Sequence, residues 1–261
     1  MYNSILFVPA TEKLLPKIEE CNADMVIIDL EDAIPDNEKT SALCILKTFL
    51  EEYSYSKDIY VRINCNRLRE EIQVLNCYDI KGYMLPKTES VSDIEKISCV
   101  ANKKNIVALV ETAMGIINIG EIAKSDKISM IAFGAEDYTT QCKIKNDSLF
   151  LSYPKSKIVA YSKAFNKPVF DTISLNITDK ELYRKEVYDS YNYGFDGKLA
   201  IHPMQIDIIN EIYHNIDIEY YKHIIYEYEK NGQGVLNING KVFERPHIEQ
   251  IKRKLKEFYN D

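Results

Sequence analysis

Acidic side chains follow several short apolar runs in this chain, and their positions are the first indication of chemistry. The acids at the ends of these runs are Asp29, Glu31, Asp32, Glu111, Glu136 and Asp137. Carboxylates brought together in a dry cavity repel one another strongly, and a bound cation relieves that repulsion. Oxygen ligands without a neighbouring His or Cys pair are typical of a hard divalent metal, Mg²⁺ or Mn²⁺. The acids therefore indicate a metal site that leaves positions for water and substrate.

Another apolar run, DIYVRIN, carries the basic residue Arg62 and the polar residue Asn64 at its end. Alternate residues of a strand share a face, so Arg62 shares one with Tyr60, and Glu111 shares one with Leu109. If those faces point into the interior of one barrel, Arg62, Glu111 and Asp137 converge on one cavity.

The same residues also have purely structural interpretations. A Glu close to an Arg, as with Glu111, is often a buried ion pair. Asp29 and Asp32, each taken alone, are as often structural as catalytic. For Lys87 and Lys198, a solvated or ion-pairing lysine is the default interpretation.

Eight short apolar segments recur along the chain and are typical of strands that are covered on both faces. They are residues 4–10, 24–32, 58–64, 81–88, 105–112, 128–137, 167–172 and 197–203. The stretches between them carry helix signals, such as the helix stop at Gly194. Eight strand–helix units in a chain of this length predict an α/β fold, the (β/α)₈ barrel. A doubly wound open sheet, the competing fold, predicts a Gly-rich phosphate turn, which the first segment lacks.

The residues after the eighth segment follow a different pattern. They predict a long helical stretch, a Gly-punctuated hairpin and a last helix. We predict a barrel core over residues 1–213 and a C-terminal arm over residues 214–261. The arm is expected to be an oligomer contact or a lid and not an independent domain. In a parallel barrel, chemistry is found at the carboxyl ends of the strands, where the candidate residues lie.

Composition and charge exclude several classes of partner. The chain has 261 residues, 46% of them hydrophobic, and a net charge of −7, which argues against nucleic acid and anionic membranes. No apolar run approaches the ~18 residues needed to span a bilayer. The six cysteines show no CxxC pair or zinc spacing, which is typical of reduced thiols in a cytoplasmic protein.

Several motifs, taken together and in order, resemble one known family. They are SILFVPA, DMVIIDLEDAIPDNEKTSA, VRIN, GYMLPKTES, ALVETAMGIINIGEIA, AFGAEDYT, GFDGKLAIHPMQIDIINEIY and NGKVFERPHIEQIKRKL. The chain resembles the citrate lyase β-subunit-like family of the pyruvate/phosphoenolpyruvate barrel superfamily, which includes malyl-CoA and citramalyl-CoA lyases. The resemblance implies a (β/α)₈ barrel that associates through its C-terminal region, often as a trimer.

The resemblance also implies a reaction and a set of site residues. Glu111 and Asp137 would bind Mg²⁺, and Arg62 would contact the substrate, with Glu111 and Lys87 beside it. Asp29 and Glu31 would order metal-bound water or orient Arg62. The implied reaction is carbon–carbon cleavage of a 3-hydroxyacyl thioester, on coenzyme A or an acyl carrier protein, into an acetyl thioester and a 2-keto acid.

The chain departs from the family pattern at a few positions. Asn3 replaces an Arg whose loss would weaken a contact to substrate or carrier, and Ala10 replaces a Gly. Glu244 stands where several relatives have a lid Asp that acts as acid or base in a neighbouring subunit. Two alternatives stay open: a metal-dependent aldolase acting on a free hydroxy-keto acid, and a non-catalytic acyl-thioester-binding homologue. Asp32, where the aldolases have a His, counts against the aldolase.

Overall fold

The structure is a computed structural model that describes residues 2–145, 148–214, 218–232, 234–238 and 240–259. The chain divides into two compact units, Tyr2–Ile212 and Tyr213–Asp261. Each unit is described by itself below.

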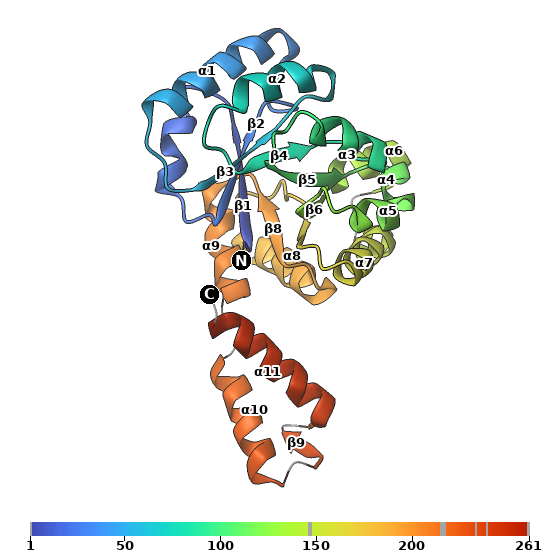
Figure 1. The fold of residues 1–261 in the computed structure, drawn as a ribbon. Coiled ribbons are helices and arrows are strands. Elements are labelled where there is room, and N and C mark those ends of the chain that lie inside the picture. Colours follow the sequence, from blue (N-terminus) through green and yellow to red (C-terminus); the bar gives the residue numbers. More distant parts are fainter. Residues whose placement is uncertain (1, 146–147, 215–217, 233, 239, 260–261) are drawn as a thin grey trace. The chain divides into compact units, whose positions relative to one another are not determined.

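The larger unit is a closed barrel of eight parallel strands in sequence order (Figure 1). The strands are β1 (Ser4–Pro9), β2 (Met25–Asp29), β3 (Asp58–Arg62), β4 (Gly82–Leu85), β5 (Asn105–Val110), β6 (Met130–Phe133), β7 (Val169–Asp171) and β8 (Gly197–Ala200). The barrel closes between β1 and β8, where Ile5 pairs with Leu199. Each strand lies within one of the eight apolar segments, so the predicted (β/α)₈ barrel is confirmed.

Alternate strand residues fill the barrel interior. The central core includes Tyr60, Val107, Leu109 and Leu199, all almost fully buried. The intervening residues face the surrounding helices and are apolar as well, and for that reason strands such as β2 are buried along their whole length. Arg62 therefore lies on the interior face of its strand, with Tyr60. Glu111 likewise follows the interior face of β5, with Leu109.

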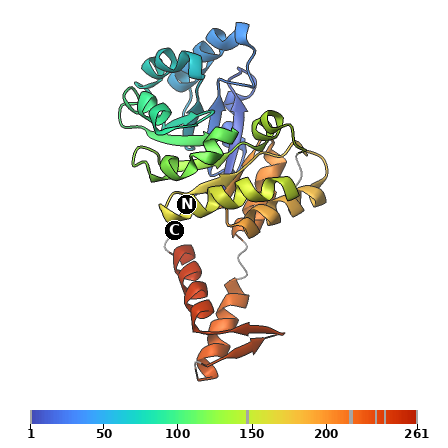
Figure 2. The same ribbon diagram turned by 90° about the vertical axis from the view of Figure 1, so that its right-hand side faces the viewer.

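Helices surround the strands in both views (Figures 1 and 2). They are η1 (Leu15–Glu20), η2 (Asp36–Glu38), α1 (Lys39–Glu52), η3 (Cys65–Arg67), α2 (Leu68–Leu75), α3 (Val91–Ser98), α4 (Ala113–Ile117), α5 (Ile119–Lys124), α6 (Ala135–Cys142), α7 (Ser148–Ala164), α8 (Lys180–Tyr193) and α9 (Pro203–His214). Helix α8 ends at Gly194, whose φ of 92° is left-handed, as the helix-stop signal predicted. Helix α6 begins at Ala135, so Asp137 lies in its first turn and not in the sixth strand.

A buried ionic cluster joins the outside of the barrel to two helices. Asp171 of β7 accepts hydrogen bonds from Lys155 of α7 (2.8 Å), Ser190 of α8 (2.5 Å) and Lys198 of β8 (3.3 Å). Burial opposes ionisation of Asp171, but Lys198 and Lys155 together hold its pKa well below the ordinary value. Lys198 is therefore a buried ion-pair partner, one of the two default interpretations of that lysine.

The smaller unit consists of α10 (Ile218–Lys230), the strand pair β9 (Leu236–Ile238) and β10 (Lys241–Phe243), and α11 (Arg245–Tyr259). It has its own apolar core, made by Ile224, Tyr228, Leu236, Ile248, Ile251 and Leu255. The two strands pair in antiparallel fashion, as expected for a hairpin. Across the described residues, no helix combines the length and the apolar character that crossing a bilayer requires.

Candidate active site

A cavity of about 420 Å³ opens at the carboxyl ends of the barrel strands. Its lining residues are Phe7, Pro9, Asp29, Asp32, Ala33, Arg62, Leu109, Glu111, Phe133, Gly134, Glu136, Asp137, Thr172, Ile173, Leu199 and Ile201. The walls are largely apolar, and the charged side chains come from the ends of β2, β3 and β5, the loop after β2 and the start of α6. Charges in such a cavity interact more strongly than on the open surface because water screens them less.

Arg62, the last residue of β3, is held by carboxylates from the last residue of β2 and from the loop that follows it. Its Nε donates to Asp29 Oδ1 (2.8 Å), and its Nη2 donates to Asp29 Oδ2 (2.6 Å). Its Nη1 lies 3.2 Å from Glu31 Oε2 and 3.3 Å from Asp32 Oδ2. The guanidinium carbon lies 5.0 Å from the centre of the Phe7 ring. The two-point contact with Asp29 fixes the plane of the guanidinium over the cavity.

Burial and the neighbouring charges shift the pKa values of Arg62 and Glu31. Burial alone would lower the pKa of Arg62, but its hydrogen bonds to Asp29 raise it further above the ordinary value. Burial raises the pKa of Glu31, and the nearby Arg62 only partly offsets that rise. Arg62 is therefore a permanent cation, whereas Glu31 is an acid whose ionised form depends on its basic neighbours.

Glu111 follows β5 and is almost fully buried. Its Oε1 accepts a hydrogen bond from the backbone N–H of Lys87 (2.7 Å). Burial raises the pKa of Glu111 to about 8, the Lys87 N–H opposes that rise, and the Asp137 carboxylate adds to it. The space for Glu111 exists because residue 134 is glycine: a Cβ there would come within 2.6 Å of both Cβ and Oε2 of Glu111.

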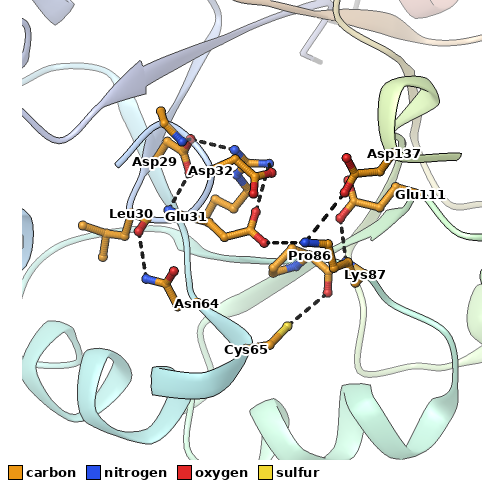
Figure 3. Close-up of polar contacts among 12 residues, drawn as sticks. Asp29, Leu30, Glu31, Asp32, Asn64, Cys65, Pro86, Lys87, Glu111 and Asp137 are labelled. Carbon is orange, nitrogen blue, oxygen red and sulfur yellow. Dashed lines mark hydrogen bonds and ion pairs between the residues drawn. The ribbon is translucent and has the colours of Figure 1, made fainter. Parts of the chain in front are cut away.

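Asp137 reaches the same cavity from the first turn of α6. The start of that helix is fixed by Thr172, whose Oγ1 accepts a hydrogen bond from the Ala135 N–H (2.9 Å). Lys87 Nζ lies 3.7 Å from Asp137 Oδ2 and 3.2 Å from Glu31 Oε1 (Figure 3). Lys87 thus contacts three acidic residues of the site, one through its backbone and two through its side chain.

A second layer of buried polar residues holds the loop after β2, which begins at Leu30 and carries Glu31. Lys39, the first residue of α1, is buried, and its ammonium donates to the carbonyl oxygens of Leu30 (3.1 Å) and Glu31. The Asn64 amide donates to the same Leu30 oxygen (2.8 Å). Glu71 of α2, fully buried, accepts hydrogen bonds from the Asn64 backbone and side chain at 2.8 and 2.6 Å. These side chains satisfy the Leu30 carbonyl and give the Glu31 carbonyl a second donor beside the Ile34 N–H.

The donor set fits a hard divalent cation. Glu111 and Asp137 supply two carboxylates to one cavity, and the buried Glu111 lacks a full counter-charge at its present contacts. Within the described ranges, no three or more His, Cys, Asp and Glu side chains form a ready-made ligand group. Mg²⁺ is often bound by one or two protein carboxylates, with its other coordination positions taken by water and substrate.

The structure brings six of the seven residues that the sequence proposed into one site: Asp29, Glu31, Arg62, Lys87, Glu111 and Asp137. Glu244 belongs to the smaller unit, where its exposed backbone caps α11 through a hydrogen bond to His247 Nδ1 (3.0 Å). Asn3 lies just before β1, at the amino-terminal end of the barrel, and its amide donates to the Asp196 carbonyl (2.6 Å). The cavity is at the opposite end of the strands, and the weakened contact to substrate or carrier that follows from replacing the family's Arg by Asn3 stays a prediction.

Sequence reasoning did not identify several supporting residues, among them Gly134, Thr172 and Lys39. Nothing in the local sequence around Gly134 shows that Glu111 needs its space. Thr172 ends an apolar segment and carries no motif of its own. Lys39 did leave a signal: it lies three and seven residues before Ala42 and Leu46, on the buried face of α1.

The fold and the site define a (β/α)₈ barrel protein of the lyase and aldolase type. The profile of the HpcH/HpaI aldolase/citrate lyase family matches residues 3–203, and the chain belongs to this family.

Individual relatives agree with this placement. The chain is 31% identical to the citrate lyase subunit beta of Leuconostoc mesenteroides subsp. cremoris, over 97% of this chain and 92% of that protein. It is 29% identical to a (3S)-malyl-CoA thioesterase of Cereibacter sphaeroides, over 97% and 93%. A solved citrate lyase beta subunit from M. tuberculosis, complexed with oxaloacetate and magnesium, matches with a TM-score of 0.71 and 27% identity, over 81% of this chain and 97% of that one.

Proposed function

We propose that this protein is a Mg²⁺-dependent carbon–carbon lyase acting on a 3-hydroxyacyl thioester of the citryl-, malyl- or citramalyl-CoA type. The observation that carries the proposal is the convergence of Glu111, Asp137 and Arg62 on one cavity. Two of the relatives support it: one is named for citrate lyase, and the other is named for malyl-CoA. The magnesium and oxaloacetate in the M. tuberculosis structure support the choice of metal and of a 2-keto acid product.

The proposed reaction breaks the bond between the carbon that bears the hydroxyl group and the carbon next to the thioester. The hydroxyl proton passes to water, the electron pair of the O–H bond forms the carbonyl, and the electron pair of the broken carbon–carbon bond passes to the thioester as an enolate. A carboxylic acid then protonates the enolate carbon, which gives the acetyl thioester. Mg²⁺, held by Glu111 and Asp137, would supply Lewis acidity to the oxygen that becomes the carbonyl.

The residues of the chain have distinct parts in this proposal. Arg62 places a permanent positive charge over the cavity, where the negative charge of the enolate develops. Asp29 and Glu31 are positioning residues, because their carboxylates hold the guanidinium. Lys87 serves as a further basic contact at the substrate end of the site. Glu244 is the proposed acid, and it would act from the arm of a neighbouring subunit.

The direct test is product analysis with purified protein. We expect malyl-, citramalyl- or citryl-CoA to give acetyl-CoA and the matching keto acid only when Mg²⁺ or Mn²⁺ is present. Glu111→Gln and Asp137→Asn should each lose more than 100-fold in rate, a loss typical of removing a principal electrostatic group. Full activity in either variant would contradict the proposed site.

Two other reactions are distinguished by the same assay. The relative named malyl-CoA thioesterase favours a second candidate, hydrolysis of the thioester itself. A thioesterase releases free coenzyme A and an intact hydroxy acid, so a thiol reagent added to the assay separates it from the lyase. An aldolase would cleave the free acid as fast as its CoA ester, and a non-catalytic homologue would be stabilised by the ester without forming product.

We further propose a cytoplasmic homo-oligomer, most simply a trimer, that takes its substrate on coenzyme A or on an acyl carrier protein. All six cysteines are free thiols, which supports a reducing compartment. Light scattering on the purified full chain measures the oligomeric state. Parallel assays with CoA and carrier-protein esters identify the carrier.

A further inference from the structure

Lys87 occupies the part of the site where a cation is needed. Its side-chain nitrogen lies between Glu31 Oε1 (3.2 Å) and Asp137 Oδ2 (3.7 Å), while its backbone N–H holds Glu111 (Figure 3). The lysine therefore neutralises acids on both sides of it and fixes the third. A lysine side chain is ordinarily protonated at neutral pH, and the two neighbouring carboxylates favour that charged form.

The backbone at Lys87 is unusual and is kept in place by these contacts. Its φ is 49°, in the left-handed region that costs a non-glycine residue about 1 kcal/mol or more. In this conformation the N–H points to Glu111 while the side chain reaches Glu31 and Asp137. A single residue thus connects the two carboxylates proposed to bind metal.

We propose that Lys87 is a tethered cation, meaning a side chain that neutralises the carboxylates of the metal-free site and competes with the divalent metal for Asp137. This inference rests on the proposed metal site at Glu111 and Asp137. The contact to Asp137 is the one that yields: it is longer than the contact to Glu31, and the Asp137 side chain is 43% exposed whereas that of Glu31 is 10% exposed. After metal binding, the ammonium stays with Glu31.

The proposed competition should weaken metal binding, and by a moderate factor only. A metal that must displace the ammonium from Asp137 binds more weakly than it would to the same acids alone. The Lys87 side chain is 46% exposed, so solvent screens its charge and the effect is moderate. We expect removal of the charge to tighten metal binding by about three- to tenfold at low ionic strength, and by less at high salt.

The experiment measures Mn²⁺ binding, with no substrate present, from the electron paramagnetic resonance signal of free Mn²⁺. The variants are Lys87→Gln, which keeps the backbone N–H to Glu111, and Lys87→Arg, which keeps the charge. Lys96→Gln is the matched control, because Lys96 forms an exposed ion pair with Asp93 on α3. We expect tighter binding only in Lys87→Gln. Lys87→Asn, which suits a left-handed backbone, replaces the Gln variant if that one does not fold.

The results separate the two levels of the proposal. Unchanged or weaker Mn²⁺ binding in a folded Lys87→Gln protein, with binding abolished in Asp137→Asn, overturns the tethered cation but leaves the metal site in place. Mn²⁺ binding that is equally strong in wild type and Asp137→Asn overturns the metal site, and the tethered cation with it. Tighter binding in Lys87→Gln that is reversed in Lys87→Arg supports both.

Discussion

The position of the Glu111 side chain depends on Gly134, a neighbouring residue that has no side chain. The carboxyl group is buried at the end of β5, and it fits there because Gly134 leaves the neighbouring space empty. The backbone of Lys87 then supplies its hydrogen bond. Burial favours the neutral form of Glu111 more strongly than this single hydrogen bond favours the ionised form, and for that reason the pKa of Glu111 is raised.

Adding one methyl group at Gly134 should disable the metal site without destroying the barrel. In Gly134→Ala, the new Cβ would lie 2.6 Å from Glu111, so the Glu111 side chain must move. We expect at least a tenfold loss of Mn²⁺ affinity, which corresponds to about 1.4 kcal/mol. Gly234→Ala is the control because no atom lies within 4 Å of its Cβ position. Equal Mn²⁺ affinity in the two variants would show that Glu111 does not need its present position.

The raised pKa of Glu111 predicts how stability changes with pH. The folded pKa of about 8 exceeds the ordinary value of 4.5, so the stabilising contribution is complete below pH 4.5 and is lost as pH rises through 8. We expect the free energy of unfolding of the metal-free protein to fall by about 3–5 kcal/mol more between pH 5 and 9 than in Glu111→Gln. Urea unfolding across this pH range measures it, and identical pH profiles would contradict the prediction.

At the scale of the elements, the strands were easier to predict from the sequence than their boundaries and the contacts around the site. The strands were predictable because both faces of each are buried, which produces apolar runs such as MVIID in β2. The boundaries were less visible: the sixth apolar segment continues past β6, and its last residues form α6. The Gly134 N–H still donates a hydrogen bond to the Val110 carbonyl of β5. The next residue, Ala135, has no such partner on a strand, and α6 begins there.

The anchoring of the loop after β2 was not predictable, because it depends on contacts between distant residues. Asn64 and Glu71 meet near the Leu30 carbonyl only after β2, β3 and α2 have packed.

Lys39 provides a test at this scale, because one element, α1, holds the loop of another. In Lys39→Met the hydrocarbon stem is largely kept, but the carbonyls of Leu30 and Glu31 lose a charged donor. We expect a loss of about 2–3 kcal/mol in the free energy of unfolding. Lys47→Met on the same helix is the control, since its exposed pair with Glu51 should contribute less than about 1 kcal/mol. Similar losses in both variants would rule out an anchoring role.

At the scale of the whole molecule, the chain combines a barrel that carries the proposed metal site with a smaller unit that carries the proposed acid. The barrel holds Arg62, Glu111 and Asp137 in one cavity, and Glu244 stands in a unit with its own apolar core. The resemblance implies that a lid acid at the position of Glu244 acts in a neighbouring subunit. If this chain works in the same way, each active site needs residues from two chains, and neither chain alone is complete.

Mixing two inactive variants tests this requirement. Arg62→Ala damages the barrel site and leaves Glu244 intact, and Glu244→Gln does the reverse, so an oligomer containing both variants can assemble an intact site from two chains. Random mixing in equal amounts should restore about a quarter of the wild-type rate when each site uses one barrel and one neighbouring lid. The control mixes Arg62→Ala with Glu111→Gln: both changes lie in the same barrel cavity, so no site escapes damage. If the first mixture is as inactive as the control while mass spectrometry shows mixed oligomers, Glu244 does not act across subunits.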